Sequence, residues 1–184
     1  LMVGRGLLDE EQGKLANAAS LLSTHDFRLN RAPGASVSDI AQAAHLTNGL
    51  RLIVVDYLGL VRSDERGLSI YERVTKNSAS LKALARSLNV PILCLAQLNR
   101  AAEQRADKCP SMADLRDSGA IEQDADIVLF LYRDEYYKEP EEGEQSTAEC
   151  IVAKNRHGST GTIKLGWIGQ FTKFITQDFE HEEL

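Results

Sequence analysis

The sequence contains no run of apolar residues long enough to cross a bilayer, which takes about 20 in succession. Its start also lacks the apolar segment and small-residue cleavage site of a secretory signal. The three cysteines are odd in number, widely spaced and without a CxxC pair, so neither a disulfide framework nor a zinc site is indicated. We therefore expect a cytoplasmic protein with no membrane partner, in which the cysteines stay reduced.

Positive charge is scarce as well, because 21 Lys and Arg stand against 27 Asp and Glu, for a net charge of -6. A protein coated with basic surface for nucleic acid has the opposite balance. Any DNA binding must therefore be local, at one loop or channel. The length of 184 residues suits one domain with a sizeable core.

The apolar pattern predicts alternating helices and strands. A helix is predicted after Asp9 as its cap, and a second after Ser36, which is spaced from Asp39 as in a capping box. Continuous apolar runs at 52–55 and 92–96 predict strands that are buried on both faces. A long amphipathic helix separates these two strands, and this order is typical of a parallel α/β sheet.

The C-terminal third predicts further strands. A third buried strand is expected at 127–132, and two more at 148–153 and 162–167 are joined by a short basic segment with two glycines. Such a segment is typical of a hairpin. One more strand is expected at 171–175. We interpret residues 1–176 as one domain and the acidic residues 177–184 as a frayed tail.

Four polar residues stand where such a fold binds ligands, at or near the carboxyl ends of strands. Asp56 follows the first buried strand, and a carboxylate there can hold Mg²⁺ through water. Gln97 follows the second, and its amide can donate to a phosphate oxygen while orienting a water molecule. Lys154 and Arg156 alternate along a strand end, so both point the same way, as cations supplied to a phosphate would. Taken alone, the Asp56 pattern more often marks an ordinary strand end, and Gln97, Lys154 and Arg156 are also typical of a loop start or of solvated charge.

The combination is more specific, because four segments resemble the C-terminal motor domain of DnaB-type replicative DNA helicases. They occur in the family's order, with compatible spacings, between about 52 and 174. The matching strings are IVVDYLGL at 53–60, SLKALA at 80–85 with AQLNR at 96–100, EQRADK at 103–108 with DLRDSGAIEQDAD at 114–126, and KNRHG at 154–158.

The resemblance implies a RecA-like α/β fold, with a mostly parallel sheet flanked by helices and a C-terminal β-hairpin. It further implies a homo-hexameric ring that binds ATP and Mg²⁺ at each subunit interface. Asp56 and Gln97 would act on the nucleotide of their own subunit. Lys154 and Arg156 would reach the γ-phosphate held by the neighbouring subunit.

The resemblance also implies binding partners. Single-stranded DNA would pass through the centre of the ring and be held by a loop of Arg116, Asp117, Ser118 and Gly119. An arginine can pair with a phosphate, and backbone N–H groups near a glycine can approach closely, so these contacts ignore base identity. Primase and a helicase loader are the protein partners that the family implies.

The chain departs from the family in one respect, because no stretch matches the phosphate-binding motif GxxxxGK[ST]. The glycines near the start do not form it, and Lys14 is followed by Leu15. We therefore expect a fragment of a helicase that is inactive by itself. Two alternatives stay open: an ATPase-deficient RecA-like interaction module, or another RecA-like ATPase of the recombinase or clock type, which the 116–126 string disfavours.

Overall fold

The structure is a computed structural model that describes residues 8–30, 34–99, 103–105, 107–137 and 146–176. The chain divides into two parts, residues 1–33 and residues 34–184, which we describe separately. The first part contains α1 (Asp9–Ser23), which begins one residue earlier than predicted. Leu8 is its N-cap, and the carboxylate of Glu11 accepts a hydrogen bond from the N–H of Leu8 at 2.9 Å. The predicted apolar face of α1 is exposed, since Leu15 and Leu22 are 59% and 69% accessible.

In the second part, α2 (Val37–His45) has the predicted capping box. Ser36 accepts from the N–H of Asp39 at 3.3 Å, and the Asp39 carboxylate accepts from the N–H of Ser36 at 2.8 Å. These bonds satisfy amide groups that have no partner within the helix.

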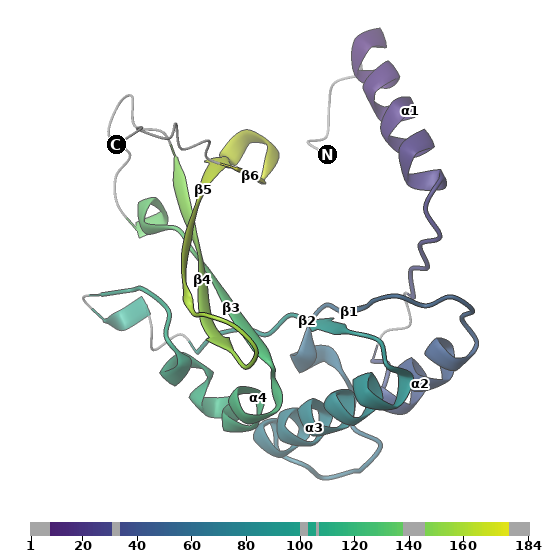
Figure 1. Ribbon diagram of the computed structural model, residues 1–184, viewed down its shortest axis with the longest axis vertical. Helices are drawn as coiled ribbons and strands as arrows, with labels where there is room; N and C mark the ends of the chain where they lie inside the picture. The colour runs from purple at the N-terminus through teal and green to yellow at the C-terminus, as the bar shows by residue number, and fades with distance from the viewer. Residues whose placement is uncertain (1–7, 31–33, 100–102, 106, 138–145, 177–184) are drawn as a thin grey trace. The chain divides into compact units, whose positions relative to one another are not determined.

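The strand–helix–strand unit predicted from the sequence is present (Figure 1). β1 (Ile53–Val55) and β2 (Ile92–Cys94) pair in parallel, with Val55 opposite Cys94. The connection runs through the short 3-10 helix η1 (Leu58–Leu60) and through α3 (Ile70–Leu88). Five buried residues from these elements and their connections form the first core: Val55, Leu58, Val61, Val74 and Leu81.

The remaining strands form an antiparallel sheet in the order β3-β4-β5-β6. Their bounds are β3 (Ile127–Tyr132), β4 (Thr147–Asn155), β5 (Gly161–Ile168) and β6 (Lys173–Thr176). The predicted hairpin is confirmed as β4 and β5, with Cys150 opposite Ile163. Among the described strands only β1 and β2 run parallel, so the antiparallel part is larger than the sequence indicated. A continuous apolar run does not specify the direction of a neighbouring strand. The prediction that these strands are buried on both faces is wrong for the described residues, because Val54, Leu93 and Leu129 are 54%, 52% and 51% exposed.

Residues 112–124 connect the two sheets. The 3-10 helix η3 (Met112–Ser118) leads directly into α4 (Gly119–Asp124), and β3 starts three residues later. Leu115, Val128 and Phe130 form a second core. Ile121 of α4 packs against both cores and so links α3 to the antiparallel sheet. Two further 3-10 helices complete the described elements, η4 (Asp134–Tyr137) and η5 (Gly169–Phe171).

Of the helices that the structure describes, none combines the length and the apolar character that a membrane crossing requires. The three cysteines are free, and burial raises the pKa of the Cys94 thiol to about 11. The tail at 177–184 lies outside the described residues.

Candidate functional site

Asp56 and Gln97 lie beyond the carboxyl ends of two adjacent parallel strands. Backbone pairing continues past both strands, because Leu95 donates to the carbonyl of Val55 and Leu58 donates to the carbonyl of Leu95, both at 2.9 Å. Both side chains are exposed. The structure therefore brings these two residues to one sheet edge, which is where open α/β sheets bind ligands.

The carboxylate of Asp56 suits a Mg²⁺–nucleotide site, and not a metal site built from protein ligands alone. Within the described ranges, no three His, Cys, Asp or Glu side chains are grouped to hold a metal ion. Mg²⁺ on a nucleotide needs only one or two protein carboxylates, because phosphate oxygens and water complete its shell. An exposed carboxylate at a strand end fits this second arrangement.

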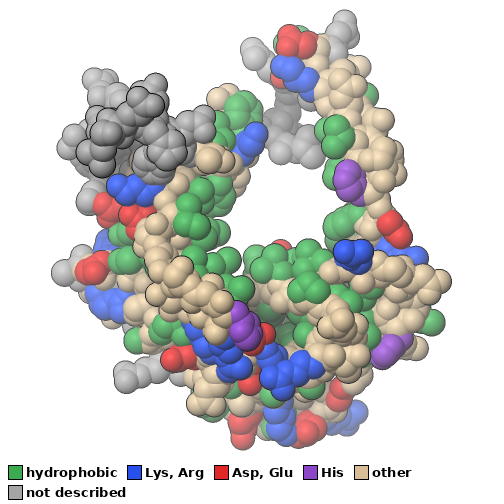
Figure 2. Space-filling view, in the orientation of Figure 1, with side chains coloured by type: hydrophobic (Ala, Val, Ile, Leu, Met, Phe, Trp, Pro, Cys, Tyr) green, Lys and Arg blue, Asp and Glu red, His purple; other side chains and the backbone are tan. Residues whose placement is uncertain are grey.

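Lys154 and Arg156 point the same way, as their alternation at the end of β4 predicts. The Nζ of Lys154 donates to the carbonyl of Glu122, and the Nη2 of Arg156 donates to the carbonyl of Gln123, each at 2.5 Å. Both acceptors lie in the last turn of α4, where backbone carbonyls lack partners within the helix and carry partial negative charge. Lys and Arg side chains gather where the β4–β5 turn meets α3 and α4 (Figure 2).

Asp126 also contacts Arg156, and sequence reasoning missed it. The Nη1 of Arg156 lies 3.6 Å from the Oδ1 of Asp126, and the N–H of Arg156 donates to the carbonyl of Asp126 at 2.9 Å. The Nζ of Lys82 in α3 forms a second ion pair with the same carboxylate. Lys82 lowers the pKa of Asp126 most, burial opposes this effect, and Arg156 lowers it further. One signal could have revealed Asp126, because an antiparallel pairing of 127 with 155 places 126 opposite 156.

The segment proposed for DNA spans the junction of η3 and α4. Arg116, Asp117 and Ser118 are the last residues of η3, and their side chains lie outside the described part of the chain. Gly119 is the first residue of α4, and a Cβ placed on it would meet no atom within 4 Å. The space beside its Cα is therefore free of other described atoms, and the phosphate contact at Gly119 stays a prediction.

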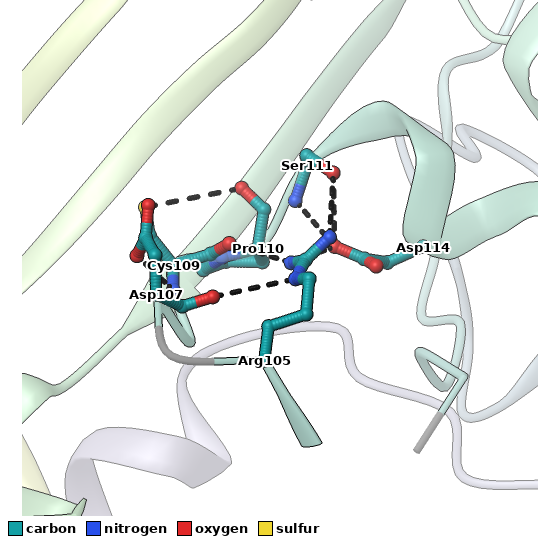
Figure 3. Close-up of polar contacts among 6 residues, drawn as sticks. All are labelled: Arg105, Asp107, Cys109, Pro110, Ser111 and Asp114. Atoms are coloured by element: carbon teal, nitrogen blue, oxygen red, sulfur yellow. Dashed lines mark hydrogen bonds and ion pairs between the residues drawn. The ribbon is translucent and has the colours of Figure 1, made fainter. Parts of the chain in front are cut away.

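An ion pair whose carboxylate is buried precedes this segment (Figure 3). The Nη2 of Arg105 donates to the Oδ2 of Asp114 at 2.8 Å and to the carbonyl of Cys109 at 2.9 Å. The N–H of Ser111 donates to the same Oδ2 at 2.7 Å. Only 5% of the Asp114 side chain is exposed. In the sequence these residues appear only as charges that balance. In the structure they form one hydrogen-bonded group at the start of η3.

Replacing Asp114 with asparagine should lower the free energy of unfolding by about 1–3 kcal/mol, because it removes the charge that faces Arg105. Burial raises the pKa of Asp114, but hydrogen bonds from Ser111 and Arg105 outweigh it and leave that pKa below its ordinary 3.8. A lowered pKa in the folded state means that the contribution is present above the ordinary value and is lost as the pH falls through the folded value. Denaturant unfolding at neutral pH and in this acid range measures both effects.

Asp107→Asn is the matched control, because Asp107 is exposed in the same loop and asparagine keeps the acceptor for the N–H of Cys109. Its effect should stay within about 0.5 kcal/mol. Equal losses for the two variants would show that the Arg105–Asp114 pair has no special role.

Comparison with known proteins matches the chain to replicative DNA helicases. The family model described as DnaB-like helicase C terminal domain matches residues 2–176. The chain is 44% identical over 181 residues to the replicative DNA helicase DnaB of Geobacillus stearothermophilus, covering 96% of this chain and 40% of that protein. It is 43% identical over 173 residues to the replicative DNA helicase DnaC of Bacillus subtilis, covering 92% of this chain and 38% of that protein. The chain thus spans about two fifths of the length of these relatives.

Two solved structures resemble the fold. One is a DnaB-like replicative helicase studied with its interactions with primase, with a TM-score of 0.87 and 36% identity, over 95% of this chain and 42% of that one. The other is an ATPase domain, with a TM-score of 0.86 and 37% identity, over 95% of this chain and 63% of that one. These similarities confirm the RecA-like α/β class predicted from the sequence.

Proposed function

Because the chain belongs to the DnaB-like helicase C-terminal domain family, we propose that it is the downstream part of an ATP-driven replicative helicase motor. This motor translocates on single-stranded DNA and unwinds the duplex at the replication fork. One observation carries the proposal: Asp56 and Gln97, which stand in the family's motifs, lie at the same edge of a parallel sheet.

We propose distinct roles for four residues at the ATP site. Asp56 holds the nucleotide-bound Mg²⁺ through water, and Gln97 orients water near the γ-phosphate. Lys154 and Arg156 serve the nucleotide of the neighbouring subunit, where they stabilise the negative charge that grows on the transferred phosphoryl group. Their contacts to α4 and Asp126, and not to Asp56 or Gln97, agree with this assignment.

The proposed assembly is a homo-hexamer with single-stranded DNA in its centre. A DnaB-like replicative helicase of similar fold interacts with primase, and we propose primase and a helicase loader as partners here. Residues 116–119 would contact the DNA backbone. We place the protein in the cytoplasm, where replication proceeds and free thiols stay reduced.

Hydrolysis measurements on the full-length protein test the proposal. We expect a phosphate-binding loop in the reading frame upstream of Leu1, and ATP hydrolysis that single-stranded DNA stimulates. A reading frame without such a loop would favour the other candidate, an ATPase-deficient interaction module, which the lack of GxxxxGK[ST] in these 184 residues keeps open.

Replacing Arg116 with alanine in the full-length protein should weaken binding to single-stranded DNA by about fivefold to fiftyfold at moderate salt, because one phosphate contact is lost. The loss should be similar on all sequences, and the slope of log affinity against log salt should fall by about 0.7. Fluorescence anisotropy with labelled oligonucleotides of differing sequence measures both.

Lys164→Ala is the control for Arg116, because it removes an exposed cation of β5 outside the proposed DNA segment. Its affinity should stay within about twofold of the unmodified protein. A strongly sequence-dependent loss for Arg116→Ala would contradict backbone recognition at this loop.

A further inference from the structure

The short helix α4 (Gly119–Asp124) joins the two proposed working parts of the motor. Its first residue, Gly119, belongs to the segment proposed to contact DNA. Its last turn supplies the carbonyls of Glu122 and Gln123, which accept hydrogen bonds from the two hairpin cations Lys154 and Arg156. A helix of only six residues therefore separates the DNA segment from the groups proposed to act on ATP.

Asp126 contacts Arg156 through both its backbone and its side chain. Its carbonyl accepts from the backbone N–H of Arg156 at 2.9 Å, which extends the β3–β4 pairing by one more bond. Its carboxylate lies 3.6 Å from the Nη1 of the guanidinium, while the Nη2 donates to Gln123. The guanidinium thus contacts both α4 and the residue that leads from α4 into β3.

Further contacts make α4 a poor candidate for independent motion. The Oγ of Ser78 in α3 donates to the Oδ2 of Asp124 at 2.7 Å, and Ile121 packs against both apolar cores. Lys82, also in α3, forms an ion pair with Asp126. The backbone acceptors of Lys154 and Arg156 are therefore held in place by α3 and by both cores.

We propose that Asp126 is a positioning residue for Arg156, because its carbonyl and its carboxylate together hold the position of the arginine and its guanidinium. This inference rests on the proposed function, because it presumes that Arg156 acts on a neighbouring subunit's ATP. The guanidinium keeps its position because the Asp126 carboxylate and the carbonyl of Gln123 both hold it.

The Asp126–Arg156 ion pair is weak, so its positioning role can be tested separately from its effect on folding. Asp126 and Arg156 are 47% and 41% exposed, and ion pairs between such exposed groups contribute little to stability. Losing the carboxylate should therefore change where the guanidinium lies much more than it changes whether the domain folds.

Asp126→Asn in the full-length protein should lower the DNA-stimulated rate of ATP hydrolysis about tenfold, while the affinities for ATP and single-stranded DNA stay within about twofold. Lys82→Gln is the matched control, because it removes the other ion-pair partner of Asp126 but leaves the contacts of Arg156 in place. Its stimulated rate should stay within about twofold. An equal loss in Lys82→Gln would overturn the proposal, because Asp126 would then act through its contact with α3.

A double-mutant cycle tests whether Asp126 acts through Arg156. Arg156→Gln lowers the stimulated rate by itself, and adding Asp126→Asn to it should cause no further loss. Additive losses would overturn the positioning role. If Asp126→Asn does not fold, Asp126→Glu replaces it in the cycle, because it keeps the charge but displaces the carboxylate by one methylene. A stimulated rate equal to that of the unmodified protein would then count against the proposal.

These assays distinguish failure of the proposed function from failure of the positioning role of Asp126. If the proposed function fails, the unmodified protein shows no hydrolysis that DNA stimulates. If only the positioning role fails, the unmodified protein is stimulated and Asp126→Asn is stimulated equally.

Discussion

Replacing Arg156 with alanine in the full-length protein should lower the rate of DNA-stimulated ATP hydrolysis by about 10³–10⁵-fold, the range seen when a phosphate-directed arginine is lost. The guanidinium carries a permanent charge and a planar set of donors, which suits it to the phosphoryl group as charge develops there. The affinity for ATP should change by no more than about twofold, because the phosphate-binding loop and the metal supply most ground-state contacts. Phosphate release with and without single-stranded DNA, together with ATP binding at equilibrium, measures both quantities.

Two further variants make the Arg156 result specific. Arg156→Lys keeps the charge but loses the planar donors, so its rate should fall between those of the unmodified protein and of Arg156→Ala. Arg86→Ala removes an exposed cation from the last turn of α3 and should leave the rate unchanged. Loss of ATP binding in Arg156→Ala would instead assign Arg156 a structural role.

The 184-residue chain by itself should show no ATP hydrolysis above background. Asp56, Gln97, Lys154 and Arg156 are present, but the backbone cradle, lysine and hydroxyl that grip the phosphates in such motors are not in this sequence. Without them the γ-phosphate is neither held nor aligned, and alignment supplies much of the rate in phosphoryl transfer. Phosphate release by the purified chain measures this directly.

The control for that experiment is a longer chain that includes the expected upstream phosphate-binding loop. It should hydrolyse ATP under the same conditions and respond to single-stranded DNA. The expectation would be contradicted if ATP hydrolysis copurified with the 184-residue chain and was lost in its Asp56→Asn variant.

The residues at the sheet edge could be predicted because their positions follow from local patterns. An apolar run that ends in Asp56, and another followed by Gln97, place both side chains after adjacent strands whatever the details of packing. The alternation of Lys154 and Arg156 predicts a shared direction in the same way, and both side chains do reach consecutive carbonyls of α4. The alternation of side chains along a strand and the order of the strands along the chain determine these positions, and both can be read from a single sequence.

The supporting contacts could not be predicted, because they depend on pairing between distant segments. Asp126 meets Arg156 only after β3 pairs antiparallel with β4, and the sequence did not specify that direction. Arg105 meets Asp114 through the fold of an irregular loop, where no periodicity indicates which charges come together. In both cases the sequence shows only a balanced set of charges, and the register and loop path decide the partners.

Subunit mixing tests the central claim most directly, because Asp56 and Arg156 are proposed to serve the same ATP from different subunits. Full-length Asp56→Asn and Arg156→Ala should each be inactive alone. In mixed rings, about a quarter of the interfaces combine an intact Asp56 with an intact Arg156 from the neighbour, so DNA-stimulated hydrolysis should return. No recovery in rings shown to contain both variants would contradict the account, because it would mean that the two residues do not act across the interface.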